Sequence, residues 1–108
     1  MNDLLSKKCE ACEGGVAALN PSQISELLNQ IDSWSVIDNH HLSKEFEFPN
    51  FVLALAFVND VGTVAEEEGH HPNIFLTWGK VGIEIWTHSI NGLTENDFIL
   101  AAKVDELL

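Results

Sequence analysis

The segment 51–68 constrains the fold more than any other part of the chain, because it has the longest helical periodicity and strand-like runs lie in pairs on both sides of it. Pro49 ends the preceding strand and Asn50 supplies an N-cap. Gly69 is suited to end the helix in the left-handed conformation. A broad apolar stripe along the segment predicts that one of its faces packs against a core.

The strand-like segments form two predicted hairpins. Asp38-Asn39-His40 is typical of a turn in the first hairpin, and Gly79-Lys80 predicts a two-residue turn in the second. Apolar and polar residues alternate in the later strand of each hairpin, which indicates one buried and one solvated face, with Lys44 as an exception on the buried side. The four predicted strands span residues 34–37, 42–48, 74–78 and 81–86.

Two further helices are predicted at the ends of this arrangement. Asn20 and Pro21 are typical of a helix start and open a helix over 21–31. Thr94 as N-cap, with Asp97 at the third helical position, begins a final helix that runs to the end of the chain. The order α-β-β-α-β-β-α predicts an α+β fold, in which three helices pack on one face of a four-stranded antiparallel sheet.

The length of 108 residues fits one domain, expected over 19–108, after a flexible leader over 1–18. The leader contains Cys9 and Cys12 in a Cys-x-x-Cys arrangement. A zinc site would need a second cysteine pair, which the sequence lacks, so we interpret the pair as reduced and without catalytic purpose, with a redox pair as the alternative.

The charge of the chain limits its partners. Seventeen acidic and five basic residues give a formal net charge of −12, and every basic residue is a lysine. This field repels phosphate backbones and anionic lipids, so no nucleic acid or membrane partner is expected, and a neutral substrate is favoured. The sequence has neither a signal peptide pattern nor an apolar run near the ~20 residues that span a bilayer, which predicts a cytoplasmic location.

Three histidines lie in or beside the second hairpin. Histidine titrates near neutral pH and so suits proton transfer in both directions. The predicted turn sets His71 opposite His88, with their Cβ atoms roughly 5 Å apart, and His70 follows the end of the long helix. By contrast, His40-His41 lies in a turn without a nearby acid, and we interpret that pair as part of a solvated loop.

Carboxylates accompany these histidines. Glu66 opens a run of three glutamates at a helix C-terminus, where negative charge opposes the macrodipole, and such an unfavourable choice often marks function. A carboxylate there would favour the protonated form of a neighbouring imidazole. Glu66 or Asp97 with the histidines would also satisfy zinc or iron in number. Adjacent strand residues such as His70 and His71 point in opposite directions, so the metal site is the less favoured hypothesis.

The combined pattern resembles the signature of the pterin-4a-carbinolamine dehydratases. It comprises Glu66-x-x-x-His70-His71-Pro72, then Trp78, Thr87-His88 and Asp97. The resemblance covers about residues 9 to 106, including Lys80-Val81, Gly92-Leu93-Thr94 and the leader cysteines with Gly14-Gly15. Against the animal members, Gly69 stands in place of a frequent Asp and Asn96 in place of a frequent Arg, which puts rate and affinity in question more than the reaction type.

The resemblance implies a hydro-lyase that converts 4a-hydroxytetrahydrobiopterin to quinonoid dihydropterin and water without a metal or cofactor. The reaction recycles the pterin of aromatic amino acid hydroxylases such as phenylalanine hydroxylase. The resemblance also implies a homodimer or homotetramer. Alternatives are a protein-binding module, since animal relatives are dimerisation partners of a homeodomain transcription factor, and a histidine-ligated metalloenzyme.

The same resemblance assigns roles to individual residues. His70 and His88 match the acid/base histidines of the family, and His71 matches its substrate-binding histidine. Glu66 and Asp97 match the supporting carboxylates. The sequence adds two tryptophans: Trp86 is interpreted as core or as pocket wall, and for Trp78 core packing is the favoured interpretation.

Overall fold

The computed structural model describes residues 4–7 and 17–108, so the predictions about Cys9 and Cys12 lie outside the described residues. Seven helices and strands follow the predicted order, with two short 3₁₀ turns added. Their bounds are η1 (Leu4–Ser6), α1 (Pro21–Leu28), β1 (Ser35–Ile37), β2 (His41–Glu47), α2 (Phe51–Glu68), β3 (Asn73–Leu76), β4 (Lys80–Ile85), η2 (His88–Ile90) and α3 (Glu95–Asp105).

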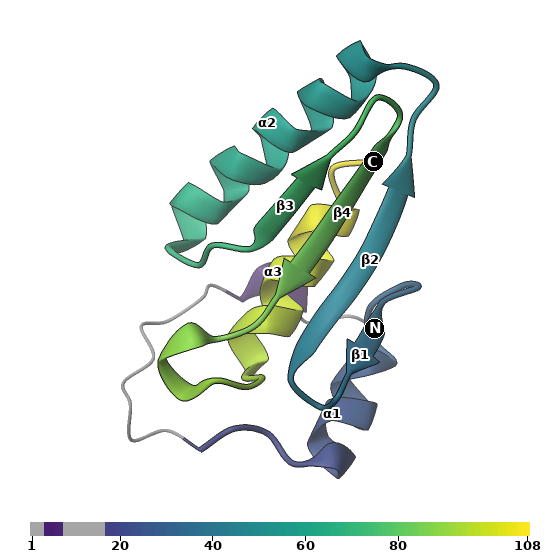
Figure 1. The fold of residues 1–108 in the computed structure, drawn as a ribbon. Coiled ribbons are helices and arrows are strands. Elements are labelled where there is room, and N and C mark those ends of the chain that lie inside the picture. Colours follow the sequence, from purple (N-terminus) through teal and green to yellow (C-terminus); the bar gives the residue numbers. More distant parts are fainter. Residues whose placement is uncertain (1–3, 8–16) are drawn as a thin grey trace.

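The strands form one antiparallel sheet in the order β1-β2-β4-β3, and the helices lie on one face of it (Figure 1). The predicted α+β architecture is therefore confirmed. The second strands of the two hairpins, β2 and β4, pair at the centre of the sheet, which leaves the short strands β1 and β3 at its edges.

Local signals set the helix ends. The side chain of Asn50 accepts a hydrogen bond from Leu53 N at 2.9 Å, and α2 ends at Gly69 with a left-handed φ of 64°. Asn20 caps α1 in the same way, with Pro21 at the first helical position. The prediction for this helix was three residues too long, because it ends at Leu28. Among the described residues, no helix is both long and apolar enough to cross a membrane.

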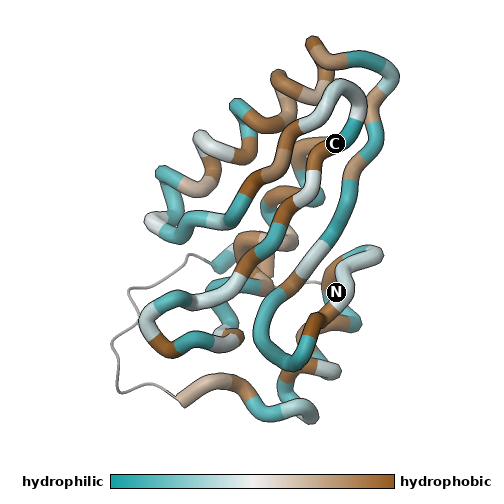
Figure 2. Tube along the Cα trace, in the orientation of Figure 1, coloured by the Kyte–Doolittle hydropathy of each residue, from teal (hydrophilic) through white to brown (hydrophobic). Residues whose placement is uncertain are grey.

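The core lies between the sheet and the helices. Apolar and polar residues alternate along β4 and recur along α2 (Figure 2), and the inward residues of β4 are fully buried. Helix α3 is buried on nearly every side because it contacts β4, α1, α2 and η1. The inward residues of these elements are Leu42, Phe46, Ala54, Phe57, Val61, Val81, Ile83, Ile85, Phe98 and Leu100.

Lys44, the polar exception on the buried face of β2, is held by a partner from α3. Its Nζ lies 2.8 Å from Asp105 Oδ1 and donates to the carbonyl of Asp32 at 2.6 Å. The other oxygen of Asp105 accepts a hydrogen bond from Trp34 Nε1 at 3.0 Å. These bonds tie the end of α3 to the first hairpin, so this charge has a structural role.

The predicted register of the second hairpin was wrong. Ile74 pairs with Ile83, and Thr77 N donates to Lys80 O at 2.9 Å, so Trp78 and Gly79 form the centre of the turn. A Cβ on Gly79 would lie 2.8 Å from the carbonyl oxygen of Phe48, which explains why glycine is needed there. Trp78 is consequently 68% exposed, against the prediction that it packs in the core.

Candidate active site

Asp97, at the start of α3, is the most buried polar group of the site, with a fully covered side chain. It accepts three hydrogen bonds. Oδ1 lies 2.5 Å from His70 Nε2, while Oδ2 accepts from Thr87 Oγ1 at 2.9 Å and from Thr94 N at 2.8 Å. A buried carboxylate requires such partners to remain ionised. The bond from Thr94 N, together with Thr94 as N-cap, confirms the predicted capping arrangement.

His70 is held on both its backbone and its side chain. After Gly69 turns the chain, His70 N donates to Ala65 O at 3.2 Å, the long bond of a Schellman cap. Because the Asp97 carboxylate accepts from Nε2, the proton of neutral His70 sits on Nε2 and its Nδ1 carries a free lone pair. His70 therefore has the arrangement of an oriented general base, whose ring is held by the buried carboxylate of Asp97.

His71 has a different and more exposed partner. Its Nε2 is hydrogen-bonded to the Glu66 carboxylate, and the two side chains are 61% and 78% exposed. Of the other glutamates in this run, Glu68 pairs with Lys103 at 2.7 Å and joins α2 to α3. These partners offset the unfavourable position of the carboxylates at the end of the helix.

His88 lies beyond the end of β4, in η2, so the predicted pairing of His71 with His88 was wrong. The observed register, if extended, would set Trp86 opposite His71. The His88 imidazole packs on the Trp86 indole with ring centroids 4.4 Å apart and planes inclined by 50°.

The loop that carries His88 is closed by Thr87 N, which donates to Gly92 O at 2.9 Å. Thr87 also bonds Asp97, which links the His88 loop to His70.

The prediction that His40 and His41 form a solvated loop was also wrong. Both rings are half-buried and contact Trp86, at centroid distances of 5.2 and 5.8 Å. His40 Nε2 lies 2.9 Å from Asn91 Oδ1, in the loop that carries His88. The sequence did not indicate that His40 and His41 lie near the other histidines, because this proximity depends on distant parts of the chain. The pairing of β2 with β4 brings the turn of the first hairpin to the end of β4.

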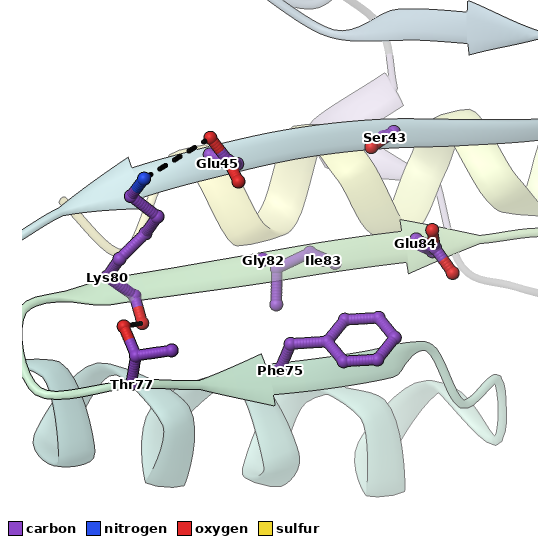
Figure 3. Close-up of a pocket in the computed structure, with 8 residues that line it drawn as sticks. All are labelled: Ser43, Glu45, Phe75, Thr77, Lys80, Gly82, Ile83 and Glu84. Atoms are coloured by element: carbon purple, nitrogen blue, oxygen red, sulfur yellow. Dashed lines mark hydrogen bonds and ion pairs between the residues drawn. The ribbon is translucent and has the colours of Figure 1, made fainter.

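Trp86 is half-buried on the sheet face away from the helices. Further along this face, a groove of about 170 Å³ runs across β2, β4 and β3 (Figure 3). Phe75 packs over Gly82 within it, and Glu84 lies at the end nearer His41, whose Nε2 is 3.9 Å from Glu84 Oε2. In the part of the chain that the structure describes, no group of three or more His, Cys, Asp or Glu side chains is arranged to hold a metal ion.

Thr87 and Thr94 are the site residues that sequence reasoning missed as functional. Their hydroxyl oxygens lie 2.9 Å apart, and both residues are buried. The signal for Thr87 was its position two residues beyond β4, in line with the inward-facing apolar residues of that strand, since a polar group at such a position needs a buried partner.

Comparisons with known proteins agree with the predicted resemblance. The family described as pterin 4 alpha carbinolamine dehydratase matches residues 17–107. A relative from Rickettsia canadensis is 53% identical over 106 residues, covering 97% of both chains, and one from Rubrobacter xylanophilus is 50% identical over 107 residues, covering 99% of this chain and all of the relative. Both relatives carry the name pterin-4-alpha-carbinolamine dehydratase.

Solved structures extend the likeness to the fold. A Brucella melitensis protein titled a transcriptional coactivator/pterin dehydratase aligns with a TM-score of 0.79 and 32% identity, over 83% of this chain and 97% of its own. A pterin dehydratase-like protein, titled a RuBisCO assembly factor of the alpha-carboxysome, aligns with a TM-score of 0.61 and 31% identity, over 69% and 88%. The chain thus belongs to the pterin carbinolamine dehydratase family, whose enzymes are hydro-lyases.

Proposed function

We propose that the protein dehydrates 4a-hydroxytetrahydrobiopterin to quinonoid dihydropterin by histidine acid/base catalysis. The C4a–O bond breaks as the hydroxyl takes up a proton and leaves as water. The proton on N5 is removed, and the electron pair of the former N5–H bond forms the N5=C4a double bond. One proton is donated and one is accepted, so the number of protons on the enzyme is conserved, and exchange with solvent returns the base and the acid to their starting states before the next turnover.

The observation that carries this proposal is the buried bond between His70 and Asp97. A carboxylate that accepts from Nε2 leaves Nδ1 as the proton acceptor. We therefore assign His70 as the base that takes the N5 proton. His88 is assigned as the acid for the departing hydroxyl, because it is exposed and its ring is supported by Trp86.

The remaining site residues are assigned to substrate binding. His71 and Glu66 form an exposed hydrogen-bonded pair beside His70, suited to the polar edge of a pterin. Trp86 is assigned a supporting role, because the imidazoles of His40, His41 and His88 all pack against its indole. A net charge of −12 without arginine fits an uncharged substrate such as a pterin better than a phosphorylated one. The biological role we propose is cytoplasmic recycling of the pterin cofactor of aromatic amino acid hydroxylases.

A coupled assay tests the proposal. Phenylalanine hydroxylase generates the carbinolamine, and its decay to the quinonoid product is followed with and without the protein. Lys44→Met, a change outside the site, serves as a control for the general effect of a substitution. Faster decay with wild type and control supports the function, whereas decay at the uncatalysed rate with the folded wild type would reject it.

We also propose that the protein is a homodimer or homotetramer. Near the start of α2, four apolar side chains are 40–74% exposed, and no charged residue lies between positions 51 and 59. An exposed apolar surface of this kind is typical of an interface. The residues are Phe51, Val52, Leu53 and Leu55. Light scattering should give a multiple of the 12.0 kDa chain mass, reduced by Val52→Lys, and a wild-type monomer at micromolar concentration would contradict this proposal.

A further inference from the structure

The turn between β1 and β2 reaches the loop that carries His88. Asp38 and Asn39 both have φ of 54°, as in the turns that close tight hairpins, and His40 follows them directly. His40 Nε2 lies 2.9 Å from Asn91 Oδ1. This hydrogen bond spans 51 positions of the sequence and fastens the first hairpin to the loop after β4.

The rings of this region form a continuous packed group. The centroids of His40 and Trp86 are 5.2 Å apart, with planes inclined by 43°, and those of Trp86 and His88 are 4.4 Å apart. The His40 ring and the His88 ring therefore both contact the Trp86 indole. Movement of His40 would remove one of the ring contacts that hold the indole on which His88 rests.

The hydrogen bonds of His40 fix its protonation pattern. With the Asn91 amide oxygen as acceptor, His40 Nε2 carries a proton. Its Nδ1 then accepts from His41 Nδ1 at 3.0 Å. The His40 ring is thus held from both sides in one orientation.

We propose that His40 is a positioning residue that holds the His88 loop and ring in place for catalysis. It acts through Asn91 and Trp86 and does not touch the reacting atoms. This inference rests on the proposed function, in which His88 is the acid. Loss of the bond should lower kcat about three- to tenfold, the range for one hydrogen bond, with little change in KM.

Matched variants separate the hydrogen bond from the ring contact. His40→Phe keeps a ring but has no donor, whereas His40→Gln can still donate to Asn91. Asn91→Gly removes the acceptor and accepts the positive φ of 51° at this position. Thr77→Val, which removes a loop hydrogen bond in the other hairpin, is the control.

We expect His40→Phe and Asn91→Gly each to lower kcat about three- to tenfold. The double variant should be no slower than either single variant, and His40→Gln should recover most of the rate. Full kcat in both single variants, or multiplied losses in the double variant, would overturn the proposal. NMR of the His88 ring gives a readout independent of turnover. A shifted or broadened His88 signal in His40→Phe, with Thr77→Val unchanged, supports positioning even if the wild type fails the dehydratase assay, and an unchanged signal would contradict it.

Discussion

Asp97→Asn tests the link between the buried carboxylate and the state of His70. The asparagine has nearly the same shape, but it offers one acceptor oxygen and one NH₂ group in place of two oxygens. Its oxygen would accept from Thr87 Oγ1 and Thr94 N, as Oδ2 of Asp97 does. The NH₂ group would then face His70 Nε2, which forces the proton of neutral His70 onto Nδ1 and removes the lone pair that we assign to catalysis.

The expected losses in stability and rate differ in size. Hydrogen bonds to charged groups contribute about 1.5–3 kcal/mol and those between neutral groups about 0.5–1.5 kcal/mol, so each retained bond weakens by about 1 kcal/mol. Relief from burying a charge offsets part of this loss, which leaves about 1 kcal/mol and a fall in Tm of about 4–8 °C. The wrong tautomer should cost about 10²–10⁴-fold in kcat, equivalent to about 3–5 kcal/mol of transition-state stabilisation.

The measurement combines thermal unfolding with the coupled dehydration assay at 25 °C. Asp105→Asn is a matched control, because Asp105 is a half-buried aspartate of α3 whose carboxylate also accepts three hydrogen bonds, from Lys44, Trp34 and the backbone of Asp32. It should lose similar stability and keep its rate. If Asp97→Asn stays folded with at least half of the wild-type kcat, Asp97 does not set the tautomer of His70. If both variants lose rate equally, the effect is general destabilisation.

Other substitutions have distinct expected effects. Thr87→Val removes a buried donor to Asp97 and should lower the free energy of unfolding by about 1–2 kcal/mol in denaturant titration, with kcat reduced about tenfold or less; an unchanged stability would contradict the bond. Lys44→Met leaves the Asp105 carboxylate without its cation and should cost about 1–3 kcal/mol with unchanged kcat; a large loss of kcat would place Lys44 in catalysis. Glu66→Gln should change stability by less than about 0.5 kcal/mol, because its pair with His71 is exposed, and should raise KM; an unchanged KM argues against substrate binding by Glu66.

Features encoded by neighbouring residues were predictable from the sequence. Helix α2 begins after Asn50 and ends at Gly69, as predicted, because helix caps depend on side chains and φ angles within a few positions. The same holds for Thr94 and the capping carboxylate of Asp97. The order of elements then limited the fold to an antiparallel sheet covered on one face, which the structure confirms.

The register of the second hairpin could not be read from hydrophobic alternation. Moving the turn by one residue changes which residues lie opposite one another but leaves Val81, Ile83 and Ile85 on the inward face. The pattern is therefore the same in both registers. The deciding interaction is the approach of Gly79 to the backbone of Phe48 on another strand, which requires knowledge of the packed sheet.

Contacts between distant segments explain the other differences. The bond between His70 and Asp97 was predicted only as a shared neighbourhood, whereas its geometry and its extension to Thr87 depend on how α3 docks on the sheet. The proximity of His40 to Asn91 arises because β2 and β4 pair along their length. In the sequence these residues had no local signal of a shared site.

The most direct test of the proposed acid/base mechanism measures the decay of enzymatically generated carbinolamine in the presence of wild type, His70→Ala or His88→Ala. We predict that wild type accelerates decay, and that each variant, shown to be folded by its thermal transition, loses about 10²-fold or more of this activity. Full activity in both variants would contradict the assignment of acid and base to these histidines. No acceleration by the folded wild type would contradict the proposed reaction itself.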